Sequence, residues 1–544
     1  MKTNLKIFVL ALCAMFCSQF TFARIIYVDL HNPLYANWAG ANHPQAFNNA
    51  NSWAMAIPDL QYAMYYAQNG DEIWVKETPF SDPYVPMENI PPVPPPNGNI
   101  PTPPNFFWIL NDVHVYGGFA GWERSLNDRV SWFINQTHLS TYQHVADYTL
   151  YMQGSNSLID GFYIDFYCPR IAGIVMESGT ADDNQVISNT IIKGNIFKYS
   201  GFSPPDEKIG IINVGGSNTI TPNSRCISAK LYNVVIHGFT LNSSGTDQNS
   251  LINVDGGRLT IHNVTIADNV ADPRNHNPNG IPGLAVTLGM GGMFGQIINT
   301  PIEVTIINTI IWYRPWYDYL SYNNGSAAIK LEDFGYGTIS AYNSDIMDSG
   351  GSGSGFWTRN IIDRGNNIDA DPEFLIDCYS PTLPANLSHI WYELCNPANP
   401  VVDAGSNTVG ICLLNLWWYN QYDLKNEDRI ENGIIDMGAF EWQNWQYNHT
   451  ANIQRTPRKN DNQDNENNLL QIYPNPASET AILQLGDLTS GKVFITDLQG
   501  RTLETFNITK NNLVIDVTKY QTGIYLVRIV SDKINVTERL IVSK

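Results

Sequence analysis

The sequence predicts an all-β protein made of a right-handed parallel β-helix with a short N-terminal capping helix, followed by a small antiparallel β-sandwich. A strand unit built around asparagine recurs through residues 24–444, which we expect to form the β-helix domain. Short apolar runs separated by turn residues occupy residues 469–544, where we expect the sandwich. Residues 445–468 are polar and almost free of apolar side chains, so we expect a disordered linker there.

Residues 1–23 have the pattern of a signal peptide. Lys2 and Lys6 precede an apolar run, and a cleavage position with small side chains lies between Ala23 and Arg24. We therefore expect the mature chain to begin at Arg24. No later apolar run approaches the roughly 20 residues that cross a bilayer, so no transmembrane segment is expected in the mature chain.

Composition excludes several kinds of partner. Only 15% of residues are charged and the net charge is −20, so we expect a solvated extracellular surface and no nucleic-acid partner. The cysteines beyond the signal segment are Cys168, Cys226, Cys378, Cys395 and Cys412. This odd number leaves at least one thiol unpaired, and although Cys378 and Cys395 would close a plausible loop, the pairing stays open. No Cys/His spacing indicates zinc.

The start of the β-helix domain carries the predicted capping helix. Pro58 and Asp59 are a typical helix start, Asn69-Gly70 is a typical end, and apolar residues between them recur with helical spacing. A strand at residues 73–75 follows directly, so we expect the helix to cover the first coil and to block pairing at its edge. The Pro-rich segment at about residues 79–104 is expected to be an extended surface loop.

The repeat has apolar residues four and two places before an asparagine and an isoleucine three places after it. Its clearest copies are Leu259-x-Ile261-x-Asn263-x-x-Ile266 and Val304-x-Ile306-x-Asn308-x-x-Ile311, and further copies centre on Asn189, Asn233 and Asn343. Alternating apolar residues indicate a strand with one buried face. We expect each asparagine to turn the chain in the left-handed conformation and its side chain to bond the peptide groups of neighbouring coils. A leucine-rich repeat, the alternative, needs a steadier period and more leucine.

The apolar runs at residues 493–495, 513–515 and 524–527 are rich in β-branched and aromatic side chains, as strands require. Several motifs accompany them in order: Tyr473-Pro474-Asn475-Pro476, Gly500 within residues 497–501, Gly523 and Tyr525 within residues 520–528, and the closing residues 540–544. With these motifs the domain resembles the C-terminal sorting domain of type IX secretion cargo. The resemblance implies passage through the periplasm, recognition by the type IX machinery, delivery to the exterior or the outer-membrane surface, and later removal of the domain.

Two groups of motifs that bracket residues 24–444 carry a second resemblance. At the start they are residues 51–54, 70–75 and 115–123, and at the end residues 369–374, 402–405, 428–430 and 435–441. The domain is similar to the pectate-lyase-like β-helix proteins called choice-of-anchor Q. That resemblance implies a fold and variable anchoring at a surface, and it implies no particular reaction.

Few residues are candidates for chemistry. Asp255 and Arg258 flank a Gly-Gly turn and supply the two charges that a polysaccharide lyase needs, but a turn-stabilising Asp and a solvated Arg are the favoured explanation. Asp369 and Asp371 have the ligand type for calcium, although a turn in the closing motifs is favoured there too. His262 superficially suits a polygalacturonase-type hydrolase, without the patterns that accompany such a histidine. No other cofactor is predicted.

Aromatic side chains gather after Asn308 and near the closing motifs. Aromatic rings stack on the apolar faces of sugars, and exposed rings on loops often mark binding. The candidate ligand-binding residues are Trp312, Tyr313, Trp316, Tyr317, Tyr319, Trp417 and Trp418. The competing explanation is that these rings cover the solenoid, with Trp312 buried.

The leading functional hypothesis is a secreted or cell-surface protein that binds carbohydrate or a ligand on a host or neighbouring cell, as an adhesin does. The alternatives are a polysaccharide lyase or glycoside hydrolase acting on an acidic polysaccharide, and a structural surface protein. An enzyme should bring Asp or Glu together with Lys, Arg or His on adjacent coils. A binding protein should show exposed rings without such a cluster, and a structural protein should show neither.

Overall fold

Parallel strands make up most of the regular structure in residues 24–442, and antiparallel strands make up that of residues 471–542. The chain falls into two units, residues 1–447 and 448–544, and each is described by itself. The computed structural model describes residues 24–37, 43–86, 105–109, 112–129, 132–141, 148–153, 155–166, 172–177, 183–194, 196–197, 210–215, 227–241, 250–254, 257–271, 286–288, 302–312, 329–331, 337–358, 360–375, 392–408, 422–430, 433–442, 471–473, 477, 480–484, 490–496, 501–508, 512–521, 523–530 and 535–542. The expected signal peptide, the linker and most of the Pro-rich loop lie outside them.

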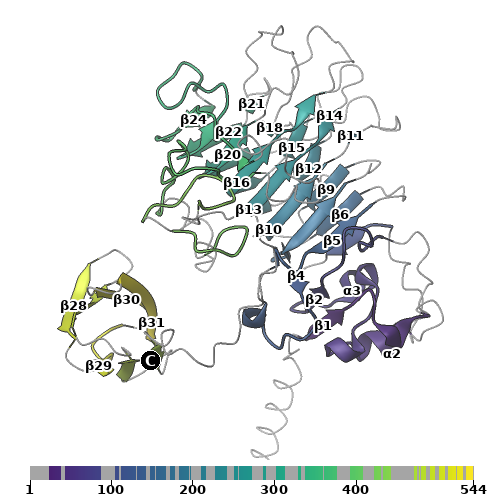
Figure 1. Cartoon of the computed structure of the whole chain (residues 1–544), viewed down its shortest axis with the longest axis horizontal. Coiled ribbons are helices and arrows are strands. Elements are labelled where there is room, and N and C mark those ends of the chain that lie inside the picture. Colours follow the sequence, from purple (N-terminus) through teal and green to yellow (C-terminus); the bar gives the residue numbers. More distant parts are fainter. Residues whose placement is uncertain are drawn as a thin grey trace, which may run out of the picture. The chain divides into compact units, whose positions relative to one another are not determined.

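The largest sheet of the first unit has strands that follow one another in chain order and pair in parallel (Figure 1). Its main path is β1 (Ile25–Val28), β2 (Glu72–Lys76), β4 (His114–Phe119), β7 (Leu158–Asp160), β10 (Asp183–Lys193), β13 (Ile227–His237), β16 (Arg258–Ala267), β19 (Ile302–Ile307), β22 (Gly337–Tyr342) and β24 (Ile361–Asp363). Beside this path lie β5 (Thr137–Ser140), β8 (Phe162–Asp165), β20 (Ile310–Trp312) and β23 (Asp345–Ile346). We call it the large sheet.

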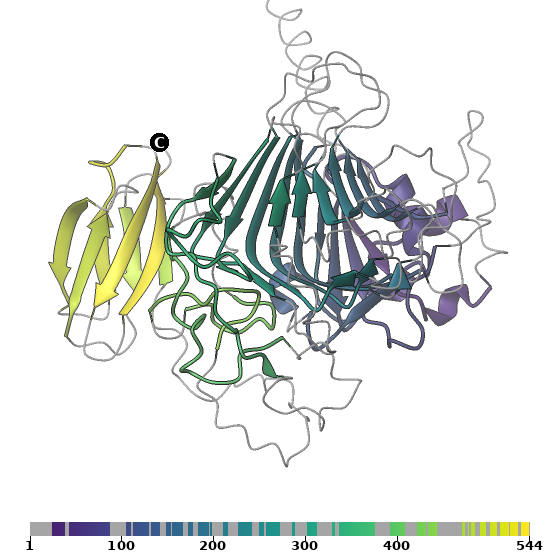
Figure 2. The same cartoon turned by 90° about the horizontal axis from the view of Figure 1, so that it is seen from above.

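Two further parallel sheets complete the described part of this unit. One contains β3 (Phe107–Ile109), β6 (Tyr148–Gln153), β9 (Ala172–Glu177), β12 (Gly210–Gly215), β15 (Ser250–Val254), β18 (Val286–Leu288) and β21 (Ile329–Leu331). The other contains β11 (Ile196–Phe197), β14 (Thr240–Leu241) and β17 (Val270–Ala271). Side chains of the two larger sheets share one apolar core, for example Ile187 and Ile261 with Ile174 and Ile252. Figure 2 shows these strands running side by side in the colour order of the sequence, and the prediction of an all-β protein is confirmed.

The repeat asparagines bend the large sheet at one register. Asn189, Asn233, Asn263, Asn308 and Asn343 all have φ between 43° and 54°, in the left-handed region. The residues before and after them pair in matching register, so the asparagines stack from strand to strand. Asparagine tolerates this conformation better than most residues. The prediction of a left-handed asparagine in each repeat is therefore confirmed.

The bonds between neighbouring strands at this bend differ from the expectation. The hydroxyl of Thr309 accepts from the backbone N–H of Val264 at 3.4 Å, and the hydroxyl of Ser344 accepts from the N–H of Thr309 at 3.1 Å. The side chain directly after the asparagine thus satisfies the peptide group of the neighbouring strand. A hydroxyl there stays close to its own backbone, whereas the asparagine amide reaches outward and is left for another partner.

A short helix covers the first strands, as predicted. α3 (Leu60–Tyr66) begins at Asp59, whose carboxylate accepts the N–H of Tyr62 at 2.8 Å, and its residues from Leu60 to Met64 are buried. It packs against β1, β2 and β3. The other helical segments described are η1 (Pro33–Tyr35), α2 (His43–Asn48), η3 (Trp53–Met55) and η4 (Leu126–Asp128).

Residues 372–442, which we call the closing segment, fold back onto the outer face of the large sheet. Their described parts have almost no regular structure, yet they supply most of a second apolar core. The closing-segment residues in this core are Phe374, Tyr392, Leu394, Val401, Leu424, Met437, Ala439 and Phe440. They pack on the sheet residues Tyr163, Ile191, Val235, Ala267 and Ile310. The closing segment also contains Cys395, which forms a disulfide with a partner outside the described residues.

The asparagine amides bond the closing segment. Asn233 donates to the carbonyl of Tyr422 at 2.8 Å, and Asn308 both donates to the carbonyl of Ser406 and accepts from its N–H, at 3.1 and 2.8 Å. Arg429 is fully buried and donates to the amide oxygen of Asn233 at 2.9 Å. The repeat asparagines therefore serve both the bend of each strand and the attachment of the closing segment.

The second unit consists of two antiparallel sheets around one core. One contains β25 (Gln471–Tyr473), β26 (Thr480–Gln484) and β29 (Asn512–Asp516), and the other β27 (Lys492–Thr496), β28 (Thr502–Asn507), β30 (Gly523–Val530) and β31 (Asn535–Val542). Tyr473 thus ends β25, Gly523 begins β30, and the hydroxyl of Tyr525 donates to the carbonyl of Gln521 at 2.9 Å. Pro474, Asn475, Pro476 and Gly500 lie outside the described residues.

Candidate functional site

A tightly held turn after β4 exposes a tryptophan. Glu123 is buried, and its carboxylate accepts the backbone N–H groups of Ala120, Gly121 and Trp122 at 2.6, 2.9 and 2.9 Å. Gly121 has φ of 99°, a conformation that only glycine adopts readily. The indole of Trp122 nevertheless remains 59% exposed. The fold therefore fixes the backbone of this turn and leaves its largest side chain in water.

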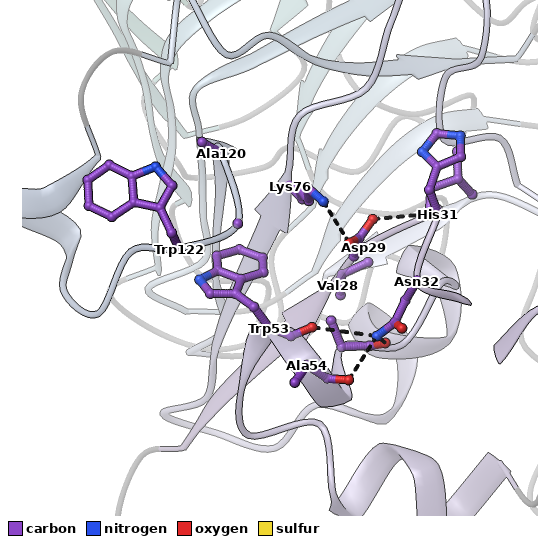
Figure 3. A network of polar contacts seen from close by, with 12 residues as sticks. Val28, Asp29, His31, Asn32, Trp53, Ala54, Lys76, Ala120 and Trp122 are labelled. Carbon is purple, nitrogen blue, oxygen red and sulfur yellow. Dashed lines mark hydrogen bonds and ion pairs between the residues drawn. The ribbon is translucent and has the colours of Figure 1, made fainter. Parts of the chain in front are cut away.

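Polar side chains surround the base of this turn. Trp53 donates from its indole N–H to the carbonyl of Glu123 at 2.9 Å, and Lys76 forms an ion pair with Asp29 at 2.9 Å. Figure 3 shows Trp122 on the outer side of the turn near Trp53, with the Asp29–Lys76 pair in the same region. The amide of Asn32 donates to the carbonyl of Ala56 at 2.8 Å and so ties down the chain beside this pair.

A second exposed ring follows β2. Phe80 is 57% exposed, although the edge of its ring meets the buried ring of His138, with centroids 5.6 Å apart. The loop that carries it is anchored by a hydrogen bond between His31 Nε2 and the carboxylate of Asp82 at 2.8 Å. β2 and β4 are parallel neighbours, so the loops that follow them leave the same edge of the large sheet. Trp122 and Phe80 therefore belong to one edge, which we call the ring edge.

Charged groups at the ring edge can bond hydroxyl groups. Partial burial raises the pKa of Glu77, Lys76 opposes this shift and Glu123 adds to it. Carboxylate oxygens such as those of Glu77 and Asp29 accept hydrogen bonds, and the ammonium of Lys76 donates them. Aromatic faces combined with a few charged hydrogen-bonding groups suit a polyhydroxylated ring.

Of the two predicted catalytic residues, Arg258 is described and Asp255 is not, so their pairing stays a prediction. Arg258 forms an ion pair with Glu303 at 3.0 Å, with 61% and 46% of the two side chains exposed, and Asp255 lies outside the described residues. His262 is buried, and burial lowers its pKa to about 3, with a further contribution from the charge of Arg429. A neutral, covered imidazole is out of reach of a sugar. The ordinary explanation of Arg258 as a solvated side chain fits this geometry.

Asp369 and Asp371 stabilise turns in the structure. Asp369 accepts the N–H groups of Asp348 and Gly350 at 3.2 and 2.7 Å, and Asp371 accepts that of Glu373 at 2.9 Å. Among the residues that the structure describes, no group of three or more His, Cys, Asp or Glu side chains is arranged to hold a metal ion. The turn role favoured from the sequence agrees with these bonds, and calcium binding here stays a prediction.

Of the predicted aromatic residues, Trp312 is described and the others are not. Trp312 ends β20, is partly buried and packs against the second apolar core, so its ring helps to cover the sheet. The predicted contacts outside the described residues are Tyr313, Trp316, Tyr317, Tyr319, Trp417 and Trp418. Trp122 and Phe80 were not predicted as contacts. An aromatic residue beside a glycine in a turn directly after a strand was the available signal for Trp122.

Residues 471–543 match a protein family described as the secretion system C-terminal sorting domain. The predicted sorting domain is confirmed by this match, which indicates a secreted or cell-surface protein and implies contact with the type IX secretion machinery. The chain matches no curated protein. No helix in the described part of the chain has both the length and the apolar character needed to cross a membrane.

Proposed function

We propose that this secreted or cell-surface protein binds carbohydrate through the ring edge, as an adhesin does. The observation that carries the proposal is the turn of Trp122, in which a buried carboxylate fixes three peptide groups while the indole stays 59% exposed. Because the backbone of this turn is already fixed, little backbone entropy is lost when the indole stacks on a ligand. Glu77, Asp29 and Lys76 would bond the hydroxyl groups of the sugar stacked on that ring.

The domain behind this edge is proposed to be a right-handed parallel β-helix of the pectate-lyase-like, choice-of-anchor Q type, over residues 24–444. Parallel sheets whose strands follow chain order, a shared core and stacked asparagines support this architecture. A signal peptide cleaved between Ala23 and Arg24 and a disordered linker at residues 445–468 complete the proposed organisation. Removal of residues 469–544 after transit would leave the β-helix domain joined to surface polysaccharide.

The test is glycan binding by the purified mature protein on an array of neutral, acidic and sulfated polysaccharides. Trp122→Ala is expected to weaken binding to the recognised glycan at least ~10-fold, because stacked aromatic anchors carry much of such affinities. Thermal unfolding should stay unchanged because the ring is exposed. Tyr422→Ala is the matched control, since Tyr422 is an aromatic residue 45% exposed on the closing segment.

Two results would contradict the proposal. Equal glycan binding by Trp122→Ala and the unchanged protein would exclude the ring edge as the binding site. Release of shortened or unsaturated oligosaccharides would instead favour the alternative, a lyase or hydrolase acting on an acidic polysaccharide. Absence of both binding and release would favour the second alternative, a structural surface protein.

A further inference from the structure

One register row of the large sheet carries polar side chains on successive strands. Lys193 on β10 pairs in register with Asp165 on β8 and with His237 on β13. Residues at matching register in a parallel sheet point to the same face, and neighbouring strands lie about 4.8 Å apart. Lys193 and His237 each follow a repeat asparagine by four places. The three side chains therefore form a continuous line on the outer face.

Aromatic rings contact two members of this line. The ring of Phe80 lies 5.3 Å from the Lys193 ammonium. At the other end the ring of Tyr392 lies 4.9 Å from that of His237, which is buried. Asp165 and Lys193 are only partly buried. The two charged members of the row therefore remain accessible, with the Phe80 ring against Lys193.

The two charged groups of this row have unused hydrogen-bonding capacity. Among the described residues, neither the Asp165 carboxylate nor the Lys193 ammonium has a hydrogen-bond or ion-pair partner, and the Lys193 ammonium lies over the Phe80 ring. Burial raises the pKa of Asp165 by more than the charge of Lys193 lowers it. The carboxylate is thus desolvated without full compensation. Partly buried charges are ordinarily paired, so this pair is prepared for an external partner.

Acid–base catalysis is not what this row supports. Burial lowers the pKa of His237 to about 3, and the charge of Lys193 adds to that shift, so the imidazole is neutral. Its Nε2 atom is buried and has no hydrogen-bond partner within the described part of the chain, and Tyr392 packs against the ring. A sugar reaching Lys193 would not reach His237. The accessible groups are one donor and one acceptor, which suit the binding of hydroxyl groups.

We propose that Asp165, Lys193 and Phe80 form a second sugar-binding subsite, for an uncharged sugar unit of the same glycan that Trp122 binds. This inference rests on the proposed function and deepens it, because it names the ligand as a neutral oligosaccharide that spans two subsites. The subsite has one accessible cation and one accessible anion, so its net charge is zero. The net charge of −20 on the whole chain also repels a polyanionic ligand. β4 and β10 are two strand spacings apart, roughly 10 Å, so a monosaccharide cannot fill both subsites.

The experiment is titration calorimetry of the purified mature protein against neutral gluco-, manno-, galacto- and xylo-oligosaccharides, from monosaccharide to hexasaccharide. Oligogalacturonate and a sulfated oligosaccharide are the charged arms. Affinity for the recognised neutral series should rise with length. Asp165→Ala and Lys193→Met should each lower the hexasaccharide affinity about tenfold and leave the monosaccharide affinity unchanged. Lys193→Arg should retain hexasaccharide affinity, and Arg258→Met, which removes an exposed cation of the same sheet, is the control.

The outcomes separate this inference from the proposed function. Unchanged hexasaccharide affinity in Asp165→Ala and Lys193→Met, with loss in Trp122→Ala, overturns the subsite alone. Loss in the first two variants without loss in Trp122→Ala overturns the role of Trp122 and supports the subsite. Preference for a charged arm that depends on Lys193 overturns the neutral ligand. Binding of none of these probes overturns both proposals. Thermal unfolding of each variant shows that it is folded, and Lys193→Arg tests the subsite without removing the charge.

Discussion

Two turns of the first unit are held by buried carboxylates, and they differ in where they place their aromatic side chain. Glu123 accepts three backbone N–H groups, and its turn leaves Trp122 59% exposed. Asp436 accepts two backbone N–H groups at 2.6 and 2.5 Å, and the residues that follow it place Phe440 in the second core with 2% exposed. Buried carboxylates thus hold backbone N–H groups in both places, near a buried ring in one and beside an exposed ring in the other.

The difference shows which turn has a role beyond stability. The bonds to Asp436 position side chains that bury apolar surface. The hydrogen bonds and the burial therefore both stabilise the folded state. Fixing the turn at Glu123 brings no comparable burial for Trp122. A turn that is fixed without burying its largest side chain gains little apolar burial from that side chain, which is why the ring edge is the better candidate for a ligand.

The largest loss of stability that we expect is for substitution of Arg429, the buried cation of the closing segment. Arg429→Met would remove the charge that lowers the pKa of Asp423 and Asp436 and would leave Asn233 without its donor. Removing one member of a buried charged network costs about 3–5 kcal/mol. Urea unfolding of the mature protein measures this loss.

Arg258→Met is the matched control for Arg429, because both substitutions remove an arginine of the same unit. Its exposed pair with Glu303 is expected to contribute less than ~1 kcal/mol. Equal losses of stability in the two variants would mean that Arg429 does not hold the closing segment on the sheet. A loss confined to Arg429→Met would confirm that role.

A smaller effect is expected at Glu123, and it should appear in two measurements. Glu123→Gln leaves an amide facing three N–H donors, which should cost about 2 kcal/mol in thermal or urea unfolding. The affinity for the recognised glycan should fall as well, because the backbone that carries Trp122 is no longer held in place. Asp128→Asn, which changes an exposed carboxylate bonded to the N–H groups of Arg124 and Ser125, should leave glycan binding intact. Full glycan affinity in Glu123→Gln would show that the held turn is irrelevant to binding.

The repeats of the large sheet could be predicted from sequence because their causes are local. Alternation around Asn263 sets the buried face, and asparagine itself adopts the left-handed bend. The closing segment has no such period. Its Phe440 and Leu424 are buried through contacts with strands far away in the sequence. The sequence pattern therefore does not predict how the closing segment packs on the sheet. It also does not predict the hydrogen bonds from Asn233 and Asn308.

The site was harder to predict because exposure is a property of the fold. Trp122 and Trp312 are both tryptophans beside strand ends, yet the first is exposed and the second packs against a core. The row of Asp165, Lys193 and His237 is spread over 73 positions of the chain, and only strand register unites it. Alignment of the repeats on their asparagines places Lys193 and His237 in one column. Asp165 is not found in this way, because the corresponding position four residues before it is Gly161 and not an asparagine.

A third prediction concerns pH and the buried carboxyl of Asp345. Burial raises its pKa to about 8; the N–H of Ala370 opposes the shift, and Asp369 and Asp371 add to it. The folded protein therefore keeps this proton up to about pH 8, whereas the unfolded chain releases it near 3.8. Between those values the folded state binds more protons, so stability rises as pH falls and is lost as pH rises. His237 and His262 have the opposite effect on stability, because burial lowers their pKa values from 6.5 to about 3. Stability therefore rises with pH on their account, but only at pH values below about 6.5.

The alkaline side isolates Asp345 from these histidines and gives the smallest of the expected effects. Raising the pH from 7 to 9 should cost about 1.4 kcal/mol of unfolding free energy, measured in urea, as Asp345 loses its proton. Asp345→Asn has nearly the same shape as the protonated acid and should remove most of this slope while changing stability little at pH 6. An unchanged slope in Asp345→Asn would assign the pH dependence to another group. A flattened slope would show that the buried carboxyl of Asp345 on β23 is kept neutral in the folded protein.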